Sequence, residues 1–88
     1  MKHASATALD RLEVLLSRLR QLSQDKLKEK KRGIFYYKSR AFLHFHEDPT
    51  GLYADVRLNG DVFERFEVTT LAQQEAFIER LVATFDPH

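Results

Sequence analysis

Two histidines two residues apart, His44 and His46, are the side chains of this sequence best suited to hold a metal ion. They lie in a segment rich in apolar and aromatic residues that is typical of a β-strand, where residues two apart point to the same side of the sheet. Asp55 is expected beside them on the next strand. Two imidazoles and a carboxylate are a donor set suited to zinc or iron. The alternative is that both histidines only stack and form hydrogen bonds on a half-polar sheet face.

The sequence gives few signals for catalysis. It has no cysteine and no Gly-x-Ser-x-Gly segment for a nucleophile, and its three glycines are isolated, so no phosphate-cradling loop is expected. Asp55 and Glu67 are the best candidates for a pair of catalytic acids, but Arg57 and Arg65 are expected beside them, which favours salt bridges. We therefore expect a protein that is not an enzyme and that needs no cofactor.

Length and composition predict one α+β domain over residues 1–88, with a flexible start over residues 1–6. The chain is 43% hydrophobic and 31% charged, a balance typical of a globular protein. The absence of cysteine is typical of a reducing compartment. No apolar run approaches the roughly 18 residues of a membrane span, and the first residues lack the apolar core of a signal peptide. We therefore expect a cytoplasmic protein without a membrane partner.

The net charge of +1 hides an uneven distribution. Residues 1–40 hold eleven Lys/Arg and four Asp/Glu, whereas residues 41–88 hold three Lys/Arg and nine Asp/Glu. The basic excess is greatest over Lys26–Arg32. Such a cluster can bind phosphates, or it can be the solvated C-terminal end of a helix, where cations are favourable. We favour the second interpretation and do not expect a nucleic-acid partner.

Helical spacing of apolar residues marks both ends of the chain. A first helix is expected to begin at Ser5 or Thr7 and either to break near Ser23 or to continue to Arg32. A last helix is expected to begin at Thr70, which forms a capping box with Gln73. The apolar stripes of these helices are Leu9, Leu12, Leu15, Leu16, Leu19 and Leu22, and Leu71, Phe77, Ile78, Leu81, Val82 and Phe85.

The middle of the chain predicts four antiparallel strands, Ile34–Lys38, Ala41–Glu47, Leu52–Leu58 and Val62–Val68. A two-residue turn at Ser39-Arg40 would set Phe35 opposite His44. A four-residue loop would then set Leu43 opposite Val56. For the last hairpin we prefer a three-residue loop at Asn59–Asp61, because it sets Asp55 opposite Arg65 instead of opposite Glu64.

This register divides the sheet into two faces. The predicted fold is therefore an α+β two-layer domain, a helix, a four-stranded antiparallel sheet and a helix, with both helices on one sheet face. The covered face would hold Ile34, Tyr36, Leu43, Phe45, Leu52, Ala54, Val56, Leu58, Val62, Phe66 and Val68. The open face would hold Phe35, Tyr37, Phe42, His44, His46, Tyr53, Asp55, Arg57, Phe63, Arg65 and Glu67.

Two central segments, Gly33-Ile34-Phe35-Tyr36-Tyr37 and Arg40-Ala41-Phe42-Leu43-His44-Phe45-His46-Glu47-Asp48, resemble those of a group of short bacterial proteins of unknown function. That resemblance implies a bacterial, cytosolic setting. The order of elements also resembles frataxin-like and YjbR-like domains, which lay two helices on one sheet face. Frataxins bind iron through an acidic first helix, whereas the first helix expected here is basic, so the resemblance implies architecture only.

Aromatic side chains on an uncovered sheet face indicate a binding surface, because such residues are enriched at interfaces. We therefore expect a homodimer, or a complex with a protein partner, formed through Phe35, Tyr37, Phe42, His44, His46, Tyr53, Arg57, Phe63 and Arg65. The alternative function is binding of a metal or another small ligand by His44 and His46.

Overall fold

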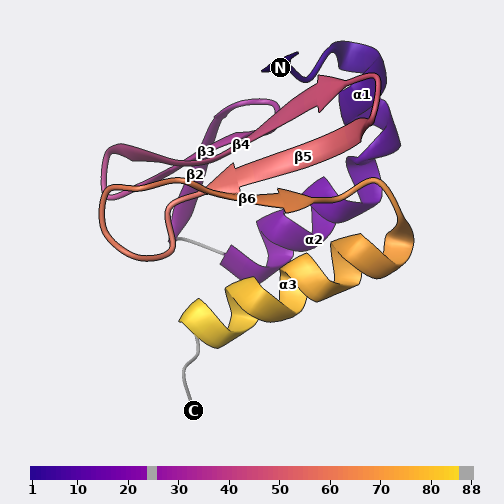
Figure 1. The fold of residues 1–88 in the computed structure, drawn as a ribbon. Coiled ribbons are helices and arrows are strands. Elements are labelled where there is room, and N and C mark those ends of the chain that lie inside the picture. Colours follow the sequence, from indigo (N-terminus) through magenta and orange to yellow (C-terminus); the bar gives the residue numbers. More distant parts are fainter. Residues whose placement is uncertain (24–25, 86–88) are drawn as a thin grey trace.

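The fold combines three helices with one antiparallel sheet, in a computed structural model that describes residues 1–23 and 26–85 (Figure 1). The predicted α+β class with an antiparallel sheet is confirmed, but the sheet has six strands instead of four. The elements are β1 (Lys2–His3), α1 (Ala6–Arg11), α2 (Glu13–Ser23), β2 (Leu27–Lys31), β3 (Ile34–Tyr37), β4 (Arg40–Asp48), β5 (Gly51–Val56), β6 (Glu64–Glu67) and α3 (Leu71–Phe85). Strands β2 to β6 are neighbours in that order, and β1 pairs with β4.

The basic segment is an edge strand and not the end of a helix. Helix α2 ends at Ser23, and β2 pairs with β3. The alternative of a helix continuing to Arg32 is therefore wrong. Leu27 is buried in the hydrophobic core, and Glu29 accepts a hydrogen bond from the Gly33 amide at 2.8 Å, closing the turn into β3. Tertiary pairing of this kind routinely overrides local helix propensity.

Residues 1–6, expected to be a flexible start, include strand β1 and the N-cap of α1. Lys2 pairs with Glu47 and His3 pairs with His46 on β4. Ser5 then caps α1, because its side-chain oxygen accepts a hydrogen bond from the Ala8 amide at 3.2 Å. The first helix is thus anchored at its start by the sheet.

The hairpin between β3 and β4 turns one residue earlier than predicted. Tyr37 pairs with Arg40, so the turn residues are Lys38 and Ser39, whose φ angles are 50° and 68°. Both residues adopt the left-handed conformation that a two-residue hairpin requires, at a cost of roughly 1–3 kcal/mol each for residues other than glycine. The register predicted from a Ser39-Arg40 turn is therefore wrong. Phe35 lies opposite Leu43 and not opposite His44.

The earlier turn alone would move the partner of Phe35 from His44 to Phe42, on the same face, and a β-bulge in β4 then makes it Leu43, on the opposite face. The register changes between the Phe35–Leu43 and Tyr36–Ala41 pairs, which leaves Phe42 as the extra residue. As a result Phe35 and Phe42, predicted on the open face, are buried in the core, at 1% and 5% exposure. Tyr37 is half-buried against the core. Tyr36, predicted on the covered face, is half-exposed with its ring 4.4 Å from the Lys30 ammonium.

The other registers agree with the sequence. Leu43 pairs with Val56, and Asp55 pairs with Arg65, as predicted. The loop is longer than the predicted Asn59–Asp61, because β5 ends at Val56 and β6 begins at Glu64, and Val62, predicted on the covered face, is 71% exposed. The predicted capping box is also confirmed, since Thr70 and Gln73 exchange hydrogen bonds of 2.9 and 3.1 Å at the start of α3.

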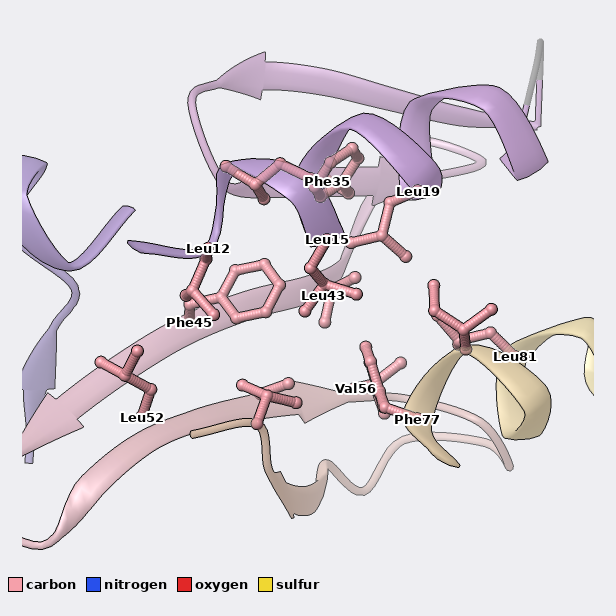
Figure 2. Close-up of a cluster of buried hydrophobic side chains, with 14 of the residues drawn as sticks. Leu12, Leu15, Leu19, Phe35, Leu43, Phe45, Leu52, Val56, Phe77 and Leu81 are labelled. Atoms are coloured by element: carbon pink, nitrogen blue, oxygen red, sulfur yellow. The ribbon is translucent and has the colours of Figure 1, made fainter. Parts of the chain in front are cut away.

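The core lies between the sheet and helices α2 and α3. Apolar side chains from both helices meet those of the central strands in one buried cluster (Figure 2). Burial of a large apolar side chain stabilises the fold by about 1.5–3 kcal/mol. The largest fully buried side chains are Phe35, Phe77, Leu12, Leu15, Leu16, Leu19, Leu43, Val56 and Val68.

No helix in the described parts of the chain is long and apolar enough to cross a membrane.

Candidate metal centre

Three histidines, His3, His44 and His46, gather on one face of the sheet. One nitrogen atom from each lies within 4.8 Å of one nitrogen of each of the others. The ring centroid of His46 lies 4.7 Å from the ring centroid of His3 and also 4.7 Å from that of His44. Antiparallel pairing sets His3 directly opposite His46, and His44 lies two residues along the same strand. The sequence therefore placed His44 and His46 together correctly and missed His3.

The backbone around β1 fixes the position of His3. The Ala4 amide donates to the Phe45 carbonyl at 3.0 Å, one residue beyond the pair formed by His3. The Ser5 amide donates to a carboxylate oxygen of Glu47 at 3.0 Å. His3 is thus held between the sheet and the capped start of α1, although its side chain is exposed to solvent.

The other two imidazoles are more buried and have free nitrogen atoms. His46 is 9% exposed and His44 is half-buried. The Nδ1 atoms of both rings are buried and make no hydrogen bond. A buried polar atom without a partner costs about 1–3 kcal/mol, so a ligand that satisfied these rings would stabilise the fold.

Both rings favour the neutral form that binds metal. Burial lowers the pKa of His44, and the neighbouring His46 lowers it further. Burial is also the main cause of the lowered pKa of His46, although nearby Asp55 opposes it. A metal ion competes with protons for imidazole nitrogen, so a lowered pKa leaves more of each ring available to a metal at neutral pH.

Asp55, predicted as the third ligand, forms an ion pair with Arg65. The three ligand atoms that lie close together are all histidine nitrogens. The Arg65 guanidinium donates to both carboxylate oxygens at 2.8 Å, which is the main cause of the lowered pKa of Asp55. The Oδ2 atom also lies 3.0 Å from Nδ1 of His46, within ion-pair distance but without an aligned hydrogen bond. Carboxylates in this outer position hold the ring of a metal-binding histidine in place.

Three other residues of the predicted open face, Phe63, Arg57 and Tyr53, lie on the same side of the sheet as the histidines, whereas Tyr37 packs against the core. The Phe63 ring lies edge-on to His44, with centroids 4.8 Å apart, and the Arg57 guanidinium lies 4.4 Å from the Phe63 ring centroid. Tyr53 forms a hydrogen bond of 2.7 Å with Thr50 through its hydroxyl. Phe35 and Phe42 are absent from this surface, because both are buried in the core.

The spacing of the three nitrogens is close to what a metal ion requires. Ligand atoms in tetrahedral zinc sites lie about 3.3 Å apart, as follows from Zn–N bonds of about 2.0 Å. The separations of up to 4.8 Å in the cluster would close by small rotations of exposed His3 and half-buried His44. Three imidazoles suit zinc, copper or nickel, whereas magnesium and calcium require oxygen ligands.

Comparison with known proteins gives no family for this chain. No family model, curated protein or solved structure matches it.

Proposed function

We propose that this protein binds one divalent transition-metal ion through His3, His44 and His46. The observation that carries the proposal is the convergence of three imidazoles from segments far apart in the sequence, with ligand atoms within 4.8 Å of one another. The buried Nδ1 atom of His44, which makes no hydrogen bond, supports it. The site is part of the sheet itself, so the fold brings the ligands together before any metal arrives.

The donor set defines the class of ion. Three neutral nitrogen ligands leave the charge of a Zn²⁺ ion uncompensated and one coordination position open for water or another ligand. Asp55, with its lowered pKa, supplies a negative charge next to His46, so the Nε2 atom of His46 is the ligand atom that we assign. The role proposed for Asp55 is therefore to orient His46, and the three histidines hold the ion.

Titration with Zn²⁺ in a calorimeter tests this function. We expect one site per chain, and His3→Ala, His44→Ala and His46→Ala should each weaken binding more than about 100-fold, because loss of an outer partner alone costs 10- to 100-fold. His88→Ala is the matched control and should bind as the unmodified chain does. Binding that survives all three cluster variants would contradict the proposal.

Self-association through the same sheet face is a second candidate function. Its support is the stacked pair of Arg57 and Phe63, together with the 71% exposure of Val62 beside them. Aromatic and arginine side chains are enriched at interface cores, and a twofold axis would let one patch serve both chains. The burial of Phe35 and Phe42 makes this apolar patch smaller than the sequence predicted.

Sedimentation of the metal-free protein at tens of micromolar tests self-association. A dimer that becomes a folded monomer on Phe63→Glu would support self-association. Phe66→Glu is not a suitable variant, because Phe66 packs against the core. A monomeric mass for the unmodified chain would exclude it. A dimer that forms only with Zn²⁺, and is lost on His3→Ala, would instead assign the open coordination position to a second chain.

A further inference from the structure

We infer that the protein has a second binding site, a pocket for a small planar molecule that carries a carboxylate or phosphate group. The pocket has a volume of about 370 Å³ and lies between the β3–β4 hairpin, the segment after β5 and the last turn of α3. Cavities that bind small molecules have volumes of about 300–1,000 Å³, so this volume suits a small ligand. We name this cavity the hairpin pocket and define it by Tyr37, Lys38, Arg40, Phe42, Arg57 and Phe85.

Aromatic rings form one wall of the hairpin pocket. The centroids of Tyr37, Phe42 and Phe85 lie 5.5–5.8 Å from one another, with Tyr37 and Phe85 in an edge-on arrangement. Phe42 is buried, whereas Tyr37 and Phe85 are half-buried and contribute partly exposed rings. Tilted rings of this kind offer an apolar surface to a flat ligand, because aromatic groups prefer offset or edge-to-face contacts.

The charged residues of the hairpin pocket are all cationic. Lys38, Arg40 and Arg57 line it, and no acidic residue of the described chain does so. The Nε atom of Arg57 is buried and makes no hydrogen bond. The Nη1 atom of the same guanidinium donates only a long hydrogen bond of 3.5 Å to the Asp61 backbone carbonyl, and an anionic ligand would give it a charged acceptor. Lys38 makes no ion pair within the described residues, whereas Arg40 is already paired with Asp61.

Two features oppose an anion in the pocket: the Asp61 carboxylate, which is paired with Arg40, and the C-terminal end of α3, whose residues Thr84 and Phe85 line the pocket. The Phe85 carbonyl accepts a hydrogen bond of 3.2 Å from the Lys26 ammonium, which offsets the negative end of the helix dipole.

Titration with phenyl phosphate, followed through backbone amide resonances, tests the inference. Shifts should be largest at the hairpin, at Arg57 and at Phe85. Phenyl phosphate should bind at least about tenfold more tightly than inorganic phosphate, which has no aromatic ring, and than benzyl alcohol, which has no negative charge. Equal affinity for inorganic phosphate would reduce the pocket to a general anion surface, and equal affinity for benzyl alcohol would reduce it to an apolar cleft. Either result would overturn the inference.

Variants that remove one positive charge provide a second test of the hairpin pocket. Arg57→Gln should weaken phenyl phosphate binding about tenfold or more, since a charge-assisted hydrogen bond is worth more than a neutral one. Lys38→Gln, on an exposed turn, provides an independent variant if Arg57→Gln lowers stability. Arg11→Gln on α1 removes the same charge away from the hairpin pocket and should leave the affinity unchanged. Unchanged affinity in both Arg57→Gln and Lys38→Gln would overturn the inference.

Discussion

At the scale of single residues, the metal centre depends on which side chain holds the ion and which only orients a ligand. His3, His44 and His46 form the nitrogen cluster, while the Asp55 carboxylate is bound by Arg65 at 2.8 Å on both oxygens. A bidentate arginine pair of this kind fixes the carboxylate geometrically as well as electrostatically. Asp55 is therefore expected to act on the metal through His46.

Asp55→Asn tests this division of roles. The variant removes the negative charge beside Nδ1 of His46 but leaves all three imidazoles. Zn²⁺ affinity should fall about 10- to 100-fold, as for other outer-shell partners, with the stoichiometry of one ion per chain unchanged. Asp61→Asn, in an exposed loop, is the matched control. Complete loss of binding in a folded Asp55→Asn variant would mean that Asp55 is itself a ligand.

At the scale of elements, the reversal of Phe35 and Tyr36 is the clearest departure from the sequence-based register. Phe35→Ala should lower the free energy of unfolding by about 3–5 kcal/mol, because it removes a fully buried ring from the core. Tyr36→Ala should cost much less, because its ring is half-exposed beneath Lys30. Urea denaturation of both variants measures the difference. Equal losses, or a greater loss for Tyr36→Ala, would support the register predicted from a Ser39-Arg40 turn.

A charged network joins α2 to the segment around β2. Glu13 accepts hydrogen bonds of 2.8 Å from both Arg20 and Arg32, and these contacts lower the pKa of its carboxyl to about 2. Because the folded pKa lies below the unfolded value of 4.5, the stabilisation is fully present above about pH 4.5 and is lost as the pH falls toward 2.

Glu13→Gln should therefore be slightly less stable than the unmodified chain at pH 7, and equally stable near pH 2. Half-exposed ion pairs contribute little and are screened, so the difference at pH 7 should shrink in high salt. Thermal denaturation over this pH range measures the difference, with Glu79→Gln, at an exposed position of α3, as the control. A difference independent of pH would show that Glu13 acts by packing and not by charge.

The elements also show how far sequence reasoning reaches. Local patterns were sufficient for α3, for the Asp55–Arg65 register and for the shared face of His44 and His46, because each depends on neighbouring residues or on one short loop. They were insufficient for His3, since the β1–β4 pairing joins residues more than forty apart. The β-bulge at Phe42 reversed Phe35, because a register change of one residue exchanges the two faces of a strand, whereas the earlier turn moves the pairing by two residues and keeps the faces.

At the scale of the whole molecule, the proposed metal joins the start of the chain to the middle of the sheet. Strand β1 consists of two residues, and the Ala4–Phe45 hydrogen bond extends its pairing with β4 by one residue. Such a short strand opens at a small cost in free energy. A metal ion bound by His3 and His46 would close this opening, because a ligand bound only to the native form stabilises it.

Hydrogen exchange of the Ala4 amide measures this coupling. Zn²⁺ at about 100 times its dissociation constant should slow the exchange of this amide about 100-fold, if opening of β1 releases the ion. The Val68 amide, which donates to the Leu52 carbonyl at the far edge of the sheet, is the internal reference and should change less. Equal slowing of both amides would mean that the metal stabilises the fold globally.

The most direct test of the central claim is the imidazole nitrogen spectrum of the protein during a Zn²⁺ titration. The ring-nitrogen resonances of three of the four histidines should shift together and reach their final positions at one equivalent of Zn²⁺. Alanine variants should assign these three histidines as His3, His44 and His46. His88 should keep its resonances throughout. Shifts that appear at different equivalents, or a set of shifting rings that lacks His3, would contradict a three-histidine metal centre.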